Sequence, residues 1–239
     1  MTGTPVHLWL VLGDDVARVA RDSELSGLLS PAEHARASRF RNAPDAQRFI
    51  TGRVLARSLL ETIGGQPASS WSLEPDSNGR PRLGGAFAEA RIDFNITHTS
   101  GLVACALTRD MAVGVDAEKR VDMPDLTSIA TRFFAPAEIA TLEATPAHQR
   151  VDTFFRIWTL KEAFVKARGG GLSIPLDSFA FDLDSAPPAC DMTGTSETDA
   201  ESWRFQLWEP SETHTMALAV RPGVNEEVVV QETRFRPSP

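Results

Sequence analysis

One apolar stretch of the sequence carries charged side chains whose types and spacing suit metal and phosphate chemistry. Residues 154–171 read FFRIWTLKEAFVKARGGG and are typical of a buried helix. Glu162 lies four residues after Trp158 and four before Lys166, and Lys161 follows Trp158 by three, so the helical repeat predicts one shared side. Taken alone, a solvated Glu–Lys pair explains this spacing better. The flanking aromatic residues instead favour a helix packed nearly all round, in which a charge needs a partner.

A second acidic motif, GVDAEKR, suggests that partner. In a strand, alternate side chains share a face, so Asp116 and Glu118 point the same way. An exposed strand end with acids at its rim is the ordinary alternative. Together with Glu162, however, these residues supply three carboxylates for one hard divalent ion. Mg²⁺ uses few protein carboxylates and takes further ligands from water and substrate phosphates, which indicates phosphate chemistry.

Basic residues elsewhere fit a phosphate-rich ligand. The segment from Ser30 to Leu60 has six arginines against two acidic residues. Arg80 lies in an Asn-Gly-Arg-Pro turn, and Thr97 and His98 lie at the polar tip of a predicted hairpin. Each feature has an ordinary explanation when taken singly: a solvated turn, a solubilising helix face or a structural histidine. Only their combination indicates a phosphate site.

Composition narrows the class of protein. The chain has 239 residues and a net charge of −8, which argues against bulk binding of nucleic acid or of an anionic membrane surface. The two cysteines, without a CxxC motif, suit a reducing compartment and give no zinc signature. No apolar run reaches the roughly 20 residues of a membrane span, and the N-terminus lacks a signal peptide pattern. We therefore expect a cytoplasmic protein.

The elements that must position these residues repeat along the chain. Strands are predicted at 6–12, 91–96, 102–108 and 111–118, and helices begin at Ser30 and run over 45–60. The stretch 135–144, APAEIATLEA, echoes SPAEHARASR at 30–39, and a long helix follows each. We therefore predict two similar α/β halves, residues 1–110 and 111–239, with a surface loop over 184–202.

These motifs together resemble a known family. NGRP, FNITHTSG, GVDAEKR, RFFAPAEIATL and FFRIWTLKEAFVKARGGGLSIPLDSF occur in the order found in 4′-phosphopantetheinyl transferases of the surfactin-synthetase-activating type. The specific part is the pair G-x-D-x-E and W-x-x-K-E-x-x-x-K at this separation. The resemblance runs from about Ser30 to Phe181 and implies a pseudo-twofold α/β monomer with coenzyme A in the cleft between its halves.

The resemblance also implies roles for single residues. It makes Asp116, Glu118 and Glu162 the ligands of Mg²⁺, with Mn²⁺ as an alternative ion. The remaining matches are contacts to the coenzyme: Thr97 and His98 at the 3′-phosphate, Lys161 and Lys166 near the pyrophosphate, Arg80 in the turn, and Arg36, Arg48 and Arg53 on the first two helices of the arginine-rich segment. Glu33 and Phe49 depart from the polar or basic residues that some members have nearby, and Thr97 and Thr99 replace commoner serines.

The function implied is that of an enzyme. It transfers phosphopantetheine from coenzyme A to a serine of an apo acyl or peptidyl carrier protein and releases adenosine 3′,5′-bisphosphate. Asp116, Glu162 and Lys166 are its expected catalytic residues, with Glu162, or a metal-bound water that it orients, as the base. The alternatives are a non-catalytic module that binds coenzyme A or a carrier on the same fold, and another Mg-dependent phosphotransferase, for which no P-loop is present.

Overall fold

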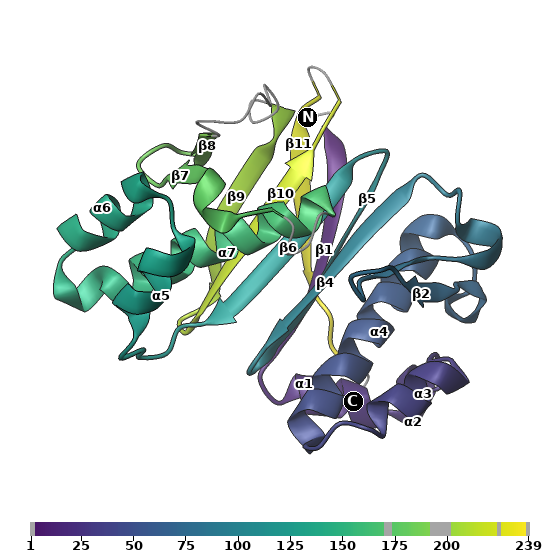
Figure 1. Ribbon diagram of the computed structural model, residues 1–239. Helices are drawn as coiled ribbons and strands as arrows, with labels where there is room; N and C mark the ends of the chain where they lie inside the picture. Colours follow the sequence, from purple (N-terminus) through teal and green to yellow (C-terminus); the bar gives the residue numbers. More distant parts are fainter. Residues whose placement is uncertain (1–2, 170–173, 192–201, 224–225, 238–239) are drawn as a thin grey trace. The chain divides into compact units, whose positions relative to one another are not determined.

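The computed structural model describes residues 3–169, 174–191, 202–223 and 226–237. It confirms a mixed α/β fold. The chain divides into two compact units (Figure 1): unit 1 comprises Met1–Met111 and Glu227–Pro239, and unit 2 comprises Ala112–Glu226. In each unit a long helix packs against an antiparallel or mixed sheet, as the repeated sequence pattern predicted.

Unit 1 contains these elements in chain order: β1 (Thr4–Leu12), α1 (Asp15–Arg21), α2 (Ser23–Ser26), α3 (Pro31–Ala37), α4 (Ala43–Gly64), the 3₁₀ turn η1 (Ala68–Ser70), β2 (Leu73–Pro75), β3 (Pro81–Leu83), the 3₁₀ turn η2 (Gly85–Phe87), β4 (Ile92–Thr99), β5 (Leu102–Arg109) and, from the C-terminal segment, β11 (Val228–Arg234).

Unit 2 contains β6 (Ala112–Lys119), α5 (Leu126–Phe133), α6 (Pro136–Ala144), the 3₁₀ turn η3 (Ala147–Gln149), α7 (Arg150–Arg168), the 3₁₀ turn η5 (Leu176–Ser178), β7 (Ala180–Asp182), β8 (Ala189–Asp191), β9 (Arg204–Ser211) and β10 (His214–Arg221).

The main sheet of unit 1 has the strand order β11-β1-β5-β4. Its strand β5 is buried from Leu102 to Thr108, and helix α4 packs against β5 and β4 to close the core. Asn42 caps the start of α4 by accepting a hydrogen bond from the backbone of Asp45, and Gly65 ends the helix in the left-handed conformation. The core therefore forms between one helix face and one sheet face.

The predicted second half, residues 111–239, differs from the observed unit 2 at its end. Strand β11 lies parallel to β1 and pairs with it from Thr4 to Leu10, and Phe235 stacks on Trp9 at 5.5 Å between ring centroids. The C-terminal segment therefore belongs to unit 1. Sequence patterning could not assign it, because the partner strand lies more than 200 residues away in the chain.

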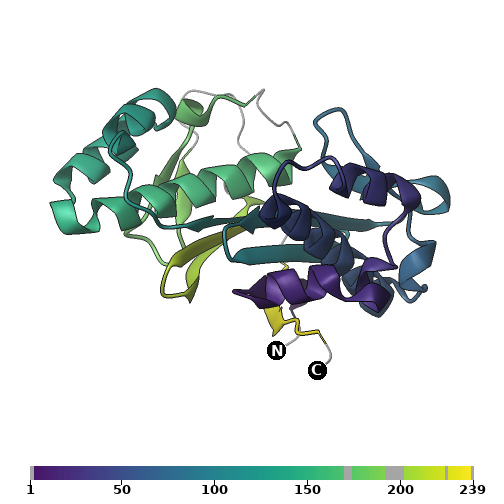
Figure 2. The same cartoon turned by 90° about the horizontal axis from the view of Figure 1, so that it is seen from below.

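Unit 2 has a three-stranded antiparallel sheet in the order β6-β10-β9, and α7 runs along one face of it (Figure 2). Phe164 of α7 sits at the centre of an aromatic cluster, with edge-on contacts to Phe179, Trp203 and Phe205. These rings bury a large apolar area and prefer edge-to-face geometry. They fix α7 on the sheet from one side.

On β6, a glycine lets α7 approach the strand directly. A Cβ atom on Gly114 would overlap the carbonyl oxygen of Ala163 and the backbone nitrogen of Ala167, both on α7. Backbone thus meets backbone at this point, with no side chain between. Since strand side chains alternate, Asp116 and Glu118 lie on the same face of β6 as Gly114 and point towards the side that α7 covers.

One helix in each unit, α3 in unit 1 and α6 in unit 2, begins with the same contact between a glutamate and the backbone of its N-cap residue. In unit 1, Glu33 accepts a hydrogen bond from the backbone of Ser30, the N-cap of α3, at 2.9 Å. In unit 2, Glu138 accepts one from the backbone of Ala135, the N-cap of α6, at 2.9 Å. The echo between SPAE and APAE therefore reflects a shared local structure.

Two further expectations meet different outcomes. Thr97 and His98 lie within strand β4 rather than at the hairpin tip, because β4 extends to Thr99. Of the predicted loop 184–202, residues 192–201 lie outside the described residues, and the described part includes the short strand β8.

Within the described ranges, no helix is both long and apolar enough to span a membrane.

The contact at Gly114 leads to a testable consequence for stability. Gly114→Ala should destabilise the protein by about 1–3 kcal/mol, since the clashing atoms are backbone atoms and can yield only if α7 moves off the strand. Urea unfolding measures this change. Gly223→Ala is the matched control, because there the added Cβ meets only the flexible side chain of Glu226 at 3.2 Å. Equal stabilities for the two variants would contradict a tight α7–β6 contact.

Candidate active site

Asp116 and Lys166 form the centre of the candidate site in unit 2. Asp116 on β6 is 4% exposed. Its Oδ1 accepts a hydrogen bond from Nζ of Lys166 on α7 at 2.6 Å, while the Lys166 side chain remains 28% exposed. The buried carboxylate therefore has a cation beside it, and that cation is still reachable from solvent.

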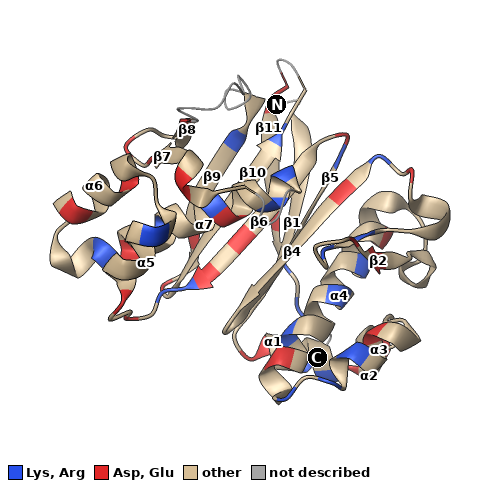
Figure 3. Cartoon of the chain, in the orientation of Figure 1, with Lys and Arg blue, Asp and Glu red and all other residues tan. Residues whose placement is uncertain are grey.

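Glu162 lies one helical turn before Lys166 and shares this environment. Burial raises the pKa of the Glu162 carboxyl above its ordinary value, the Asp116 carboxylate raises it further, and the ammonium of Lys166 partly offsets both. Two carboxylates and one ammonium thus act on each other here. Figure 3 shows the acidic bands on β6 and the charged bands along α7. A carboxyl group with a raised pKa beside a second carboxylate and a cation is typical of an acid–base or metal site.

The third predicted metal ligand, Glu118, follows on the same strand face and is half-buried. Across the described ranges of the chain, no cluster of three or more His, Cys, Asp or Glu side chains is arranged to hold a metal ion. The three predicted carboxylates therefore do not form a closed cage. Asp116 and Glu162 do converge, and two carboxylates are enough for Mg²⁺, which completes its shell with water and phosphate oxygens. The donor set fits that ion.

Lys161 departs from the predicted arrangement. Its side chain is 0% exposed, and its ammonium pairs with Glu138 at 2.7 Å. A helix turns by about 100° per residue, so Lys161 points away from the side that Glu162 uses. The predicted stripe of Trp158, Glu162 and Lys166 is present as a half-buried line, and Lys161 lies outside it, in the interior. This position argues against a contact between Lys161 and the coenzyme's phosphates.

In unit 1, Arg80 is largely committed to internal contacts. Its side chain is 11% exposed, and its guanidinium donates to Asp93 at 3.0 Å and to the carbonyl of Phe94 at 2.7 Å. The NGRP turn joins β2 to β3, with Gly79 at a positive φ of 79°. Arg80 thus ties this hairpin to strand β4, which also carries Thr97 and His98.

Thr97 and His98 have opposite environments at the end of β4. Thr97 is buried and His98 is exposed, as expected for neighbours on a strand. His98 pairs across the hairpin with Val103 of β5. Its imidazole is therefore presented on the surface of unit 1 by a well-ordered strand.

The predicted arginines of α3 and α4 surround Phe49. The guanidinium groups of Arg36 and Arg53 lie over its ring at 5.2 and 5.0 Å from the centroid. Arg53 is buried and pairs with Glu33 at 3.2 Å, Arg36 is exposed, and Arg48 pairs with Asp45 on its own helix. Arg36 is therefore the member of the predicted set that is best exposed to a ligand, and Arg53 is mainly structural.

Sequence reasoning missed two buried ion pairs, one in each unit. Arg57 of α4 pairs with Glu33 at 2.6 Å and donates to the carbonyl of Trp71, and Glu138 pairs with Lys161 in unit 2. The repeated P-A-E sequence was the available signal, because it marks both glutamates. Their partners lie more than 20 residues further on, which no local pattern can specify.

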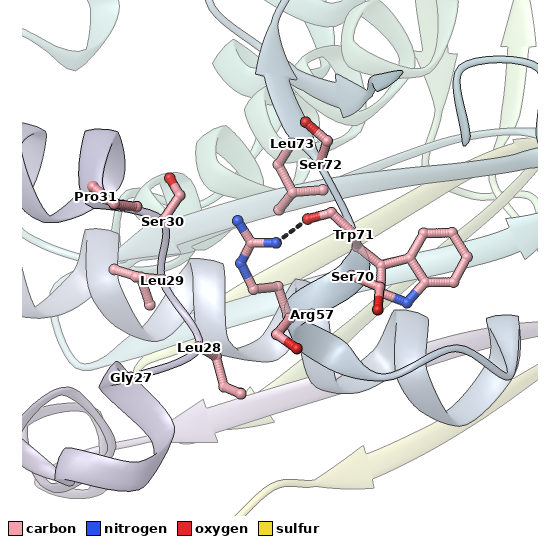
Figure 4. A pocket seen from close by; sticks show the side chains of 11 residues that line it. Gly27, Leu28, Leu29, Ser30, Pro31, Arg57, Ser70, Trp71, Ser72 and Leu73 are labelled. Carbon is pink, nitrogen blue, oxygen red and sulfur yellow. Dashed lines mark hydrogen bonds between the residues drawn. The ribbon is translucent and has the colours of Figure 1, made fainter. Parts of the chain in front are cut away.

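A cavity of about 400 Å³ in unit 1 lies next to Arg57 (Figure 4). In the close view the guanidinium points to the Trp71 carbonyl, so it is already engaged. The cavity contains none of the predicted site residues. It is lined by Gly27, Leu28, Leu29, Ser30, Pro31, Arg57, Ser69, Ser70, Trp71, Ser72 and Leu73.

Comparison with known proteins identifies the family. The sequence profile of the 4′-phosphopantetheinyl transferase superfamily matches residues 112–219, and that of the 4′-phosphopantetheinyl transferase N-terminal region matches 22–109. The chain is 35% identical over 215 residues to the 4′-phosphopantetheinyl transferase HetI of Nostoc sp., which covers 90% of this chain and 87% of the relative. It is 34% identical to the transferase Sfp of Bacillus subtilis, over 65% of this chain and 66% of that one.

One solved structure shows a partial likeness to this chain. The holo-[acyl-carrier-protein] synthase of Thermotoga maritima has a TM-score of 0.38 and 22% identity, and the match covers 46% of this chain and 61% of that one. The sequence relatives are named as transferases, which supports the enzyme and not the non-catalytic binding module. The chain therefore belongs to the 4′-phosphopantetheinyl transferases, and it is a transferase of the Sfp type.

Proposed function

We propose that the protein catalyses the attack of a serine hydroxyl on coenzyme A. The serine belongs to an apo acyl or peptidyl carrier protein. The serine oxygen bonds to the β-phosphorus, the bond from that phosphorus to the bridging oxygen of the pyrophosphate breaks, and adenosine 3′,5′-bisphosphate leaves. The serine proton passes to a base on the enzyme. The observation that carries this proposal is the contact of Lys166 with Asp116 at 2.6 Å, beside Glu162, whose pKa is raised by burial and by the Asp116 carboxylate.

Glu162 is the proposed base. A general base works best when its pKa lies near the working pH, and burial moves the pKa of Glu162 upwards in that direction. The carboxylate accepts the serine proton directly or through a water molecule that it orients. Its neighbour Lys166 then faces the negative charge that develops on the transferred phosphoryl group.

Asp116 and Glu162 are the proposed first ligands of Mg²⁺, and Glu118 lies on the same strand face as Asp116. Carboxylate oxygens suit Mg²⁺ and also Mn²⁺. When bound, the ion supplies positive charge to the pyrophosphate oxygens. Lys166, which pairs with Asp116 and keeps 28% of its side chain exposed, would be the residue of this site that contacts phosphate.

We assign the coenzyme's phosphates to exposed basic side chains of unit 1. His98 and Arg36 are exposed, and Thr97 is adjacent to His98 on β4. Arg48 is half-buried on α4. Arg80 and Arg53 act in this proposal by holding β4 and α4 in place, since their guanidinium groups already bind Asp93 and Glu33. Lys161 is left out of the phosphate contacts.

The reaction and its metal are tested together. Incubation with coenzyme A, Mg²⁺ and an apo carrier should raise the carrier's mass by one phosphopantetheine group, and the added mass should sit on a serine. Removing Mg²⁺ with EDTA should stop the reaction, and Asp116→Ala should stop it even with excess Mg²⁺ while the protein still melts cooperatively. Full turnover in EDTA would overturn the metal's role, and an unmodified carrier would overturn the activity.

The role of Glu162 is tested by Glu162→Gln. Glutamine keeps the shape and one oxygen but cannot accept the proton, so kcat at saturating Mg²⁺ should fall on the order of 10²–10⁴-fold. Coenzyme affinity, measured by calorimetry, should fall less, because it also depends on contacts elsewhere. Glu143→Gln, on the exposed side of α6, is the control and should leave kcat unchanged. A Glu162→Gln enzyme within about tenfold of the parent would move the base to another group.

The 3′-phosphate contact is tested with dephospho-coenzyme A. The parent enzyme should bind it about tenfold or more weakly than coenzyme A, since a hydrogen bond to a charged group is lost. His98→Ala should reduce this preference, because the partner of the 3′-phosphate is already gone. The exposed His148 on η3 provides the control His148→Ala, which should keep it. A preference unchanged in His98→Ala would make His98 a structural residue only.

A further inference from the structure

A buried ion pair in unit 2 lies directly behind the proposed catalytic helix face. The carboxylate of Glu138 is 0% exposed and holds three groups at once. It accepts the backbone N–H of Ala135 at 2.9 Å, the backbone N–H of Phe181 at 2.9 Å and the ammonium of Lys161 at 2.7 Å. The start of α6, strand β7 and the middle of α7 therefore meet at one carboxylate.

The ammonium of Lys161 is equally committed. Besides Glu138, it donates to the carbonyls of Leu176 and Phe179, each at 2.6 Å. Three acceptors match the three N–H donors of an ammonium group. The charge also lies over the ring of Phe179, 4.3 Å from its centroid. Such a set of fixed partners defines both the position of Lys161 along the helix axis and the rotation of α7 about that axis.

The next residue after Lys161 is Glu162, and Lys166 follows one turn later. Because Glu162 is turned by about 100° from Lys161, the rotation of α7 about its axis decides whether Glu162 and Lys166 reach Asp116. A displacement of about 1 Å at a reacting group can cost 10²-fold in rate. Anchoring at Lys161 is thus well placed to control the geometry of its catalytic neighbours.

Unit 1 contains the same arrangement without catalytic neighbours. Glu33 accepts the backbone N–H of Ser30 and pairs with Arg57 at 2.6 Å. Arg57 donates to the carbonyl of Trp71, 14 residues later, as Lys161 donates to Leu176, 15 residues later. The residue after Arg57 is Ser58. This pair offers an internal control with similar chemistry and similar burial.

We propose that Glu138 and Lys161 are positioning residues, which hold α7 in the rotation that brings Glu162 and Lys166 to Asp116. The inference rests on the proposed catalytic roles of Glu162 and Lys166. Lys161 acts through its neighbours and does not touch the coenzyme.

The experiment compares the double variant Lys161→Met/Glu138→Gln with Arg57→Met in the full-length protein. The double variant removes both charges together, so that no buried carboxylate is left without its cation. Both should melt at a lower temperature than the parent. Assayed well below their melting temperatures at saturating Mg²⁺, the double variant should lose about 10- to 100-fold in kcat. Its KM for coenzyme A should stay within about threefold of the parent value. Arg57→Met should keep kcat within about twofold.

A folded double variant with kcat within about twofold of the parent would overturn the proposal, because a merely structural pair changes stability and not turnover. An equal loss of kcat in Arg57→Met would overturn it too, since general destabilisation would then explain the effect. If the double variant does not fold, Glu138→Gln alone decides, and its kcat must fall at least about threefold. Glu162→Gln is assayed in parallel: parental kcat there refutes the assignment of the base, independently of the pair variants.

Discussion

The candidate site of unit 2 depends on one close contact between a helix and a strand. At Gly114 the backbone of α7 lies directly against the backbone of β6, where any side chain would collide with Ala163 and Ala167. That contact brings the next inward-facing residue, Asp116, within 2.6 Å of Lys166. The glycine of the G-x-D-x-E motif is thus required for packing. The acidic residues of the motif lie beside α7 because this glycine lets the helix approach the strand.

The two lysines of α7 show how burial separates structural from functional charge. Lys161 has three fixed acceptors and no exposed surface, so exchanging any of its partners for a ligand would leave a buried group unsatisfied. Lys166 keeps 28% of its side chain exposed and faces a carboxylate that can find another cation. Only the second arrangement leaves a charged group that a ligand can reach without breaking a buried network.

Sequence alone predicted the parts of the molecule that local periodicity controls. The cap at Ser30, the long helices α4 and α7, the β4–β5 hairpin and the face shared by Asp116 and Glu118 all follow from spacing of a few residues. The side of Lys161, the internal ion pairs of Arg80 and Arg53, and strand β11 did not follow from it. Each of these depends on a partner that is distant in the sequence. Asp93 lies 13 residues after Arg80, and β1 lies more than 200 residues before β11. An arginine that forms such an internal ion pair has the same local sequence context as one that binds a ligand.

The repeated glutamate–cation pair gives the two units a common framework. In each unit the capping glutamate fixes a cation of the long helix, and that cation fixes the chain segment after the helix. This anchoring uses one side of the helix and leaves the adjacent positions open. In unit 1 the next residue is Ser58, whereas in unit 2 it is Glu162, opposite a strand whose glycine admits the helix closely. The framework thus supplies rigidity in both units, and a few residues on the open side of α7 and on β6 distinguish the proposed catalytic side of unit 2 from the equivalent side of unit 1.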